Sequence, residues 1–188
     1  MIFNCYLANF SKQEFLKENA SGTIVFVETK RSADCLASLL SETDYPTTSI
    51  HGDRFQWQRK TALADFKAGR MKVLIATSVA TPGLDAKIIR HVVNYDMPSS
   101  INEYVRRIGC AGNNGKASTF FDPQYDSAIA GEFAKILEGA AQEVPQFLNE
   151  YGCGGGRDNS VGRFGGRDSD DHSITSAVAS EDEEEDWN

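Results

Sequence analysis

Two adjacent arginines, Arg106 and Arg107, are well suited by type and spacing to hold a phosphate. The turn that follows them, from Cys110 to Gly115, reads CAGNNG and carries no charge. Phosphoryl transfer needs cations beside the transferred group, so this segment leads up to a phosphate site without the cations that would complete it. Alternatively, both arginines are surface charges near a helix end, where the helix dipole favours them. Cys110 reads as a small, partly buried residue, because no histidine or second cysteine is placed to activate it.

Two further loops carry residues that suit nucleotide or nucleic-acid binding. In residues 77–85 (TSVATPGLD), small side chains let backbone N–H groups approach phosphates, and Asp85 is placed to hold a ribose hydroxyl. Residues 51–59 (HGDRFQWQR) join a Gly-Asp turn to two Arg and two Gln, which suits contacts with a phosphate backbone. Each loop has a plainer interpretation: a βα turn with a capping aspartate, and a solvated surface helix. For Trp57 three interpretations stay open: it packs against the domain, it stacks on a ligand, or it is simply exposed.

Several chemistries are missing from the pattern. The sequence contains no GxxxxGK[ST] loop for an ATP triphosphate and no acidic cluster at a strand end for Mg²⁺. Four separated cysteines without a CxxC pair predict a reducing compartment and no structural zinc. No secretory leader or membrane-spanning run is expected either. We therefore expect a soluble intracellular protein without a metal site.

Apolar, β-branched runs alternate with amphipathic segments along the first 151 residues. Strands are predicted at residues 23–27, 47–50, 72–76, 91–96 and 117–121. Helices are predicted at residues 11–18, 30–42, 56–69, 101–108, 126–139 and 144–151. This alternation is typical of βαβ units, and it predicts an α/β fold with a parallel sheet covered by helices on both faces.

The negative charge of the chain is concentrated at its C-terminal end. The net charge is −8, and residues 151–188 hold three basic and ten acidic side chains, a net of −7 that leaves residues 1–150 at −1. Glycine and like charges bury too little apolar surface to order a chain. We therefore predict a linker with a short helix (residues 1–19), a folded domain (20–151) and a disordered, Gly-rich then acidic tail (152–188).

Five segments follow one another in the order of a known family. They read GTIVFVETKRSADCLASLL, TTSIHGDRFQWQR, FKAGRMKVLIATSVATPGLD, HVVNYDMP and EYVRRIG. Residues 20–150 thereby resemble the C-terminal RecA-like domain of the DEAD-box ATP-dependent RNA helicases, and in particular the Vasa branch. The Gly/Arg segment and the acidic end closing on Trp187 also resemble that branch. The resemblance implies a single RecA-like domain.

The resemblance also implies roles for individual residues. The positions that match RNA-contacting motifs are Lys30, Gly52, Asp53, Gln56, Arg59, Thr77 and Ser78. The positions that match nucleotide-binding motifs are Gly83, Asp85 and Arg107. The family binds the RNA backbone, and it holds ATP with Mg²⁺ against an N-terminal RecA domain that has no counterpart in this sequence. ATP is therefore expected as a cofactor only if such a domain is supplied.

Two departures from the family pattern fall on the nucleotide side. Pro82 stands where relatives have the arginine of R-G-L-D, and Cys110 stands where they have the first finger arginine of H-R-I-G-R-T-G-R. The second finger arginine is lost in a short deletion before Asn113. Because such arginines stabilise the γ-phosphoryl group during transfer, the sequence predicts no catalytic residue.

These observations predict the C-terminal half of a Vasa-like helicase that cannot hydrolyse ATP or unwind RNA alone. Its expected role is that of a weak RNA-binding or partner-binding module. Two alternatives stay open: a fragment of a longer active helicase, and an interaction protein that kept the fold and lost RNA binding. In Vasa relatives this domain also docks germ-granule proteins, so these are candidate partners. A cytoplasmic location is expected, perinuclear or in germ granules, with no membrane contact.

Overall fold

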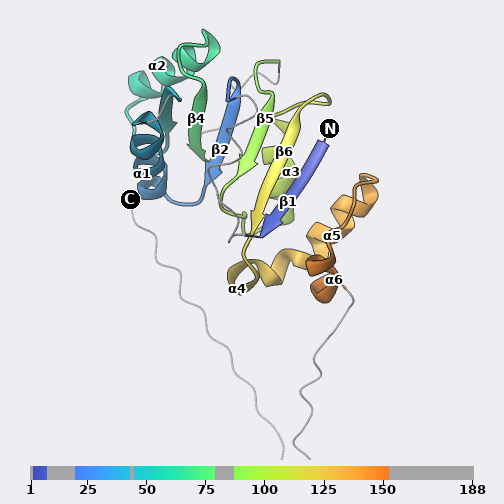
Figure 1. The fold of residues 1–188 in the computed structure, drawn as a ribbon. Helices are drawn as coiled ribbons and strands as arrows, with labels where there is room; N and C mark the ends of the chain where they lie inside the picture. The colour runs from blue at the N-terminus through green and yellow to red at the C-terminus, as the bar shows by residue number, and fades with distance from the viewer. Residues whose placement is uncertain (1, 8–19, 43–44, 79–86, 153–188) are drawn as a thin grey trace, which may run out of the picture. The chain divides into compact units, whose positions relative to one another are not determined.

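Six parallel strands of the described residues form one sheet at the centre of the fold (Figure 1). The computed structural model describes residues 2–7, 20–42, 45–78 and 87–152. The strands are β1 (Ile2–Leu7), β2 (Thr23–Val27), β3 (Thr47–Ile50), β4 (Val73–Thr77), β5 (His91–Asn94) and β6 (Lys116–Phe121). Their order across the sheet is β1-β6-β5-β2-β4-β3, and every neighbouring pair runs parallel.

The strands β2 and β4 form the buried centre of the sheet. Every side chain of TIVFV in β2 and of VLIAT in β4 is buried, and Val25 pairs with Ile75. Continuous apolar, β-branched runs are typical of strands covered on both faces. Because the strands are parallel, the residues that follow Val27 and Thr77 leave the sheet at the same edge, which is where ligands bind in such sheets.

Helices follow most of the strands. They are α1 (Lys30–Ser41), α2 (Gln56–Lys67), α3 (Ile101–Gly109), α4 (Pro123–Asp126), α5 (Ala130–Gly139) and α6 (Gln146–Gly152), with a 3-10 turn, η3 (Ser127–Ile129), between α4 and α5. Side-chain caps begin three of them: Thr29 before α1, Ser100 before α3 and Asp122 before α4. Each cap accepts a backbone N–H that the helix itself leaves unpaired.

Helices pack on both faces of the sheet. Successive side chains of a strand point to opposite faces. Val25 and Val27 therefore pack with α1, whereas Ile24 and Phe26 pack with Phe66 of α2. The prediction of an α/β fold with a parallel sheet covered on both faces is confirmed.

An apolar cluster, separate from the two that pack α1 and α2 against the sheet, holds α3, the helix that carries the two arginines. The rings of Tyr104 in α3 and Phe133 in α5 lie 4.9 Å apart in a T-shaped arrangement. Phe121 of β6 belongs to the same cluster, together with Leu148 of α6. Both aromatic rings of the T-shaped pair are buried, so the position of α3 on the sheet is determined by packing.

The sequence analysis missed the first strand. It predicts a linker over residues 1–19, whereas Ile2–Leu7 forms β1 and pairs in register with β6. The partner strand lies more than 100 residues away in the sequence, so no local pattern indicates the pairing. The predicted helix at residues 11–18 and residues 153–188 of the predicted tail lie outside the described residues.

The predicted helix at residues 126–139 begins earlier than expected and is divided. It consists of α4, η3 and α5. Asp122 accepts the N–H of Gln124 at 2.9 Å, and Pro123 occupies the first helical position. Proline suits that position because its missing N–H would have no partner there.

Candidate functional site

The polar centre of the domain lies where β2, β4 and β5 end and α3 begins. The side chain of Ser100 accepts the N–H of Glu103 at 3.3 Å and so fixes the start of α3. Glu103 lies in the first turn of the helix, and Arg106 and Arg107 lie in the last turn, which matches the polarity of the helix dipole.

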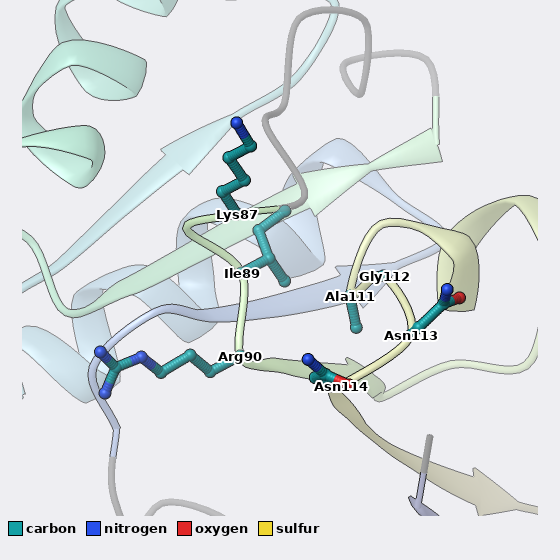
Figure 2. A pocket seen from close by; sticks show the side chains of 8 residues that line it. Lys87, Ile89, Arg90, Ala111, Gly112, Asn113 and Asn114 are labelled. Carbon is teal, nitrogen blue, oxygen red and sulfur yellow. The ribbon is translucent and has the colours of Figure 1, made fainter.

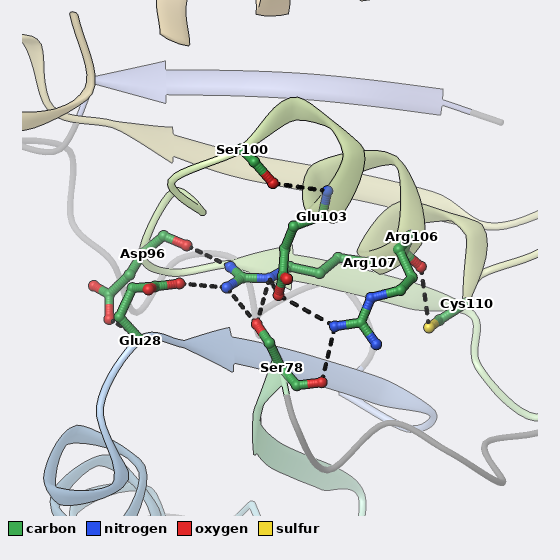
Figure 3. Close-up of polar contacts among 8 residues, drawn as sticks. All are labelled: Glu28, Ser78, Asp96, Ser100, Glu103, Arg106, Arg107 and Cys110. Carbon is green, nitrogen blue, oxygen red and sulfur yellow. Dashed lines mark hydrogen bonds and ion pairs between the residues drawn. The ribbon is translucent and has the colours of Figure 1, made fainter. Parts of the chain in front are cut away.

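Arg107 is enclosed by the protein, and its guanidinium group donates in several directions (Figure 3). Nη1 donates to the backbone carbonyl of Asp96 at 2.8 Å, and Nη2 donates to the hydroxyl of Ser78 at 2.7 Å and to the carboxylate of Glu28. Nε donates to Ser78 at 3.2 Å and to Glu103 at 3.3 Å. We call these five residues the Arg107 network. It joins the ends of three strands to one helix.

The guanidinium of Arg107 also lies over the ring of Phe26, with Cζ 5.3 Å from the ring centroid. Its side chain is 0% exposed, whereas that of Arg106 is 49% exposed. Arg107 is therefore the arginine of the pair that faces inward, which excludes the interpretation that both are surface charges. The contact of Arg107 with a nucleotide stays a prediction.

Arg106 supports the same strand end from outside. Its Nη2 donates to the backbone carbonyl of Ser78 at 2.9 Å and to Glu103 at 3.3 Å. Ser78, a position matching an RNA-contacting motif, therefore accepts hydrogen bonds from both arginines through different oxygen atoms. Thr77, the preceding residue, is buried, and its Oγ1 has no hydrogen-bond partner among the described residues.

The pKa of the Glu103 carboxyl lies below its ordinary value of 4.5. Burial is the largest single influence and raises the pKa, but it is outweighed by the hydrogen bond from Ser78 and by the positive charges of Arg107 and Arg106. A carboxyl whose pKa is lower in the folded state stabilises the protein above its unfolded pKa. That contribution is lost as the pH falls through the folded pKa.

Replacing Glu103 with glutamine is expected to lower the free energy of unfolding by about 1 kcal/mol or less at pH 7. The difference from the wild type should shrink as the pH falls below the ordinary pKa of 4.5 and through the lower folded-state pKa, because the wild-type carboxyl becomes protonated there. Urea unfolding at a series of pH values measures this. The control is Glu132→Gln, on an exposed position of α5, which should leave the pH profile unchanged. A Glu103→Gln difference that does not depend on pH would contradict the prediction.

Cys110 ends α3 and is partly buried. Its thiol lies 3.5 Å from the backbone carbonyl of Arg106, and it packs against the cluster that contains Ala111. Burial raises the pKa of the Cys110 thiol, although the charge of Arg106 opposes this. A raised pKa disfavours the thiolate, so this environment suits packing rather than nucleophilic chemistry.

The uncharged turn forms one side of a pocket of about 390 Å³ (Figure 2). Residues 111–115 line it together with Lys87, Ile89 and Arg90. In Figure 2 the charged ends of Lys87 and Arg90 are directed away from the turn. Among the described lining residues, no side-chain cation is therefore directed at the turn.

Two predicted nucleotide-binding residues, Gly83 and Asp85, lie outside the described residues. Within the described part of the chain, no three His, Cys, Asp or Glu side chains gather in a way that would hold a metal ion. No helix of that part is both long and apolar enough to cross a membrane.

Three predicted RNA-contacting residues lie together beside the start of α1. Nζ of Lys30 pairs with the carboxylate of Asp53 at 2.5 Å, and both side chains are largely exposed. Gly52 lies against that pair, and a Cβ at this position would be in ordinary van der Waals contact with Cε of Lys30, at 3.6 Å. The fold therefore brings the start of α1, which follows β2, and the connection between β3 and α2 together on one surface.

Gln56 and Arg59 form the neighbouring pair on the first turn of α2. The guanidinium of Arg59 donates to the side-chain carbonyl of Gln56. Their spacing of three residues places the two side chains on one side of the helix. The amide of Gln56 is exposed and the guanidinium of Arg59 is partly exposed, so both can donate to a ligand.

One aspartate that was not predicted from the sequence, Asp34, forms hydrogen bonds on either side of the turn at residues 51–53, which we call the HGD turn. The carboxylate of Asp34 in α1 accepts hydrogen bonds from Ser49 at 2.8 Å and from Arg54 at 2.8 Å, and it lies 3.0 Å from Nε2 of His51. Burial raises the pKa of Asp34, but the hydrogen bonds from these three partners outweigh it and lower the pKa overall. No spacing rule links Asp34 to these residues, so sequence offered no signal for it.

The comparison with protein families matches residues 7–115 to the helicase conserved C-terminal domain. ATP-dependent RNA helicase vasa of Drosophila melanogaster is 61% identical over 168 residues, which are 88% of this chain and 25% of that protein. ATP-dependent RNA helicase DDX4 of Mus musculus is 47% identical over 152 residues, 77% of this chain and 22% of that protein. The chain therefore spans about a quarter of the length of these relatives.

Solved structures of DEAD-box proteins share the fold. The RNA helicase Prp28 from Chaetomium thermophilum bound to ADP superposes with a TM-score of 0.67 at 31% identity, covering 78% of this chain and 39% of Prp28. The E. coli DEAD-box protein SrmB, bound to the regulator RraA, gives a TM-score of 0.58 at 31% identity, covering 72% of this chain and 82% of the SrmB chain.

Proposed function

Because the chain belongs to the helicase conserved C-terminal domain family, as a Vasa-like DEAD-box RNA helicase C-terminal domain with a RecA-like fold, we propose that it binds RNA without hydrolysing ATP by itself. Its expected RNA contacts are to the phosphate backbone. Binding should be weak, because one domain offers few such contacts.

One contrast carries this proposal. The polar residues of the RNA-contacting motifs that follow β2 and β3, among them Lys30 and Arg59, are exposed or partly exposed on the surface. At the nucleotide side, Arg107 is enclosed by the protein and positions 110–115 carry no charge. The exposed polar residues support binding of a polyanion. The enclosed arginine and the uncharged turn support the proposal that the chain lacks the cations that phosphoryl transfer needs.

The RNA proposal predicts binding that depends on salt. A fluorescently labelled single-stranded RNA should bind the full chain, and log affinity should fall linearly with log salt. Arg59→Ala should weaken binding and flatten the slope by about 0.7 if Arg59 neutralises one phosphate. Fluorescence anisotropy between about 50 and about 200 mM salt measures both quantities.

A control is available close to the same helix. Arg70→Ala removes an equal charge just beyond the far end of α2, where Arg70 is 63% exposed and pairs with Asp65. It should leave the slope close to that of the wild type. Binding that is flat with salt, or an equal loss in both variants, would overturn the proposed backbone contacts.

A second proposal is that the chain acts as the C-terminal half of an active RNA helicase. It is favoured by the 61% identity with an ATP-dependent RNA helicase. ATP turnover separates the two proposals when a DEAD-box N-terminal domain is added with RNA. The first predicts none, and the second predicts turnover that Asp85→Ala abolishes.

Partner docking belongs to the same set of proposals. SrmB is bound to regulator of ribonuclease activity A (RraA), and the C-terminal domain of yeast Dbp5 is bound to Gle1. These two complexes support the proposal that the C-terminal domain of a DEAD-box protein binds other proteins. For this chain we propose germ-granule proteins as partners and a cytoplasmic location.

A further inference from the structure

Two large aromatic side chains are exposed at the start of α2. Phe55, the residue that precedes the helix, is 68% exposed, and Trp57 in its first turn is 66% exposed. Large aromatic side chains are mostly buried in folded domains, where they contribute a large share of the packing. Neither ring belongs to the apolar clusters of the described residues. The fold therefore does not explain why these two positions are aromatic.

The surroundings of the two rings are positively charged. Residues 51–60, which contain both rings, hold three basic side chains and one acidic side chain, a net of +2, although residues 1–150 as a whole have a net charge of −1. Arg54 precedes Phe55, and Arg59 and Lys60 follow Trp57 by one turn or less. Exposed rings set among cations are the combination with which proteins bind single-stranded nucleic acid, where the cations follow the backbone and the rings stack on bases.

We propose that Phe55 and Trp57 stack on the bases of single-stranded RNA while Lys30, Gln56 and Arg59 contact its backbone. This inference rests on the proposed RNA binding and adds base contacts to it. Every base presents a π-face, so the contact tolerates any sequence. Lys60, three residues after Trp57, favours RNA over a protein partner, because lysine is depleted at protein interfaces.

The stacking is tested with two RNA ligands of equal length and charge. One is a single-stranded oligouridine, and the other is the same ribose-phosphate chain without bases. Phe55→Ala and Trp57→Ala should each weaken binding of oligouridine about tenfold in anisotropy titrations. Neither variant should change the affinity for the abasic chain.

Fluorescence gives a second, direct readout. Trp57 and Trp187 are the two tryptophans of the chain, so Trp187→Phe leaves Trp57 as the single indole reporter. Oligouridine should quench the emission of that protein at saturation, and the abasic chain should not. The matched control is Tyr125→Ala on α4, because Tyr125 is 76% exposed and should affect neither ligand.

The outcomes separate this inference from the proposed function. If both aromatic variants bind oligouridine like the wild type, and binding stays salt-dependent, the stacking is overturned while RNA binding stands. If no form of the chain binds either RNA, both fail. If RNA binding is unchanged and Phe55→Ala abolishes self-association in sedimentation, the rings form a contact between copies and the stacking is likewise overturned. Urea midpoints equal to the wild type establish that the variants are folded.

Discussion

Replacing Arg107 with alanine is expected to lower the free energy of unfolding by about 3 kcal/mol. The side chain is enclosed, and its removal leaves the carbonyl of Asp96 and the hydroxyl of Ser78 without their donor. Glu28 also loses its cation, at a smaller cost because its own side chain is 46% exposed and water can solvate it. The variant should therefore unfold at a clearly lower urea concentration.

The neighbouring arginine is the matched control. Arg106→Ala removes the same charge from the same helix, but Arg106 is about half exposed and should cost less than about 1 kcal/mol. Urea unfolding of both variants, followed by circular dichroism, gives the comparison. Equal midpoints would show that the Arg107 network does not stabilise the domain. Arg107→Lys should recover only part of the loss, because an ammonium group cannot reproduce the fork of the guanidinium.

Replacing Gly22 with alanine is expected to cost about 3 kcal/mol. Gly22 has φ = +79°, a left-handed conformation that costs an alanine about 1–2 kcal/mol. In addition, a Cβ at this position would lie 2.6 Å from the carbonyl oxygen of Ile88. The backbone has little freedom to relieve this contact, since the N–H of Gly22 donates to Lys72 and its carbonyl accepts from Arg90.

A second glycine separates the two effects. Gly69 has φ = +72°, and a Cβ there would meet nothing within 4 Å. Gly69→Ala should therefore cost only the conformational part, about 1–2 kcal/mol. The difference between the urea midpoints of the two variants reports the steric part alone. If both variants lose the same stability, the close approach of Ile88 is not a constraint on the domain.

Much of this fold follows from local patterns in the sequence. The run TIVFV predicts a buried strand because all five side chains are apolar or β-branched, and Thr29 and Ser100 mark helix starts because their side chains accept backbone N–H groups. β1 was not predicted, since its partner strand, β6, lies more than 100 residues away in the sequence (Ile2 pairs with Lys116).

The sequence by itself determined that positions 110–115 carry no cation, because charge is a property of residue type. It also determined that Phe55 and Trp57 lie among basic residues. Only the tertiary structure decided which arginine is enclosed, that Asp34 braces the HGD turn, and that the two aromatic rings are exposed. The physical reason is the same in each case: burial and hydrogen bonding depend on segments that are distant in sequence and meet only when the sheet forms.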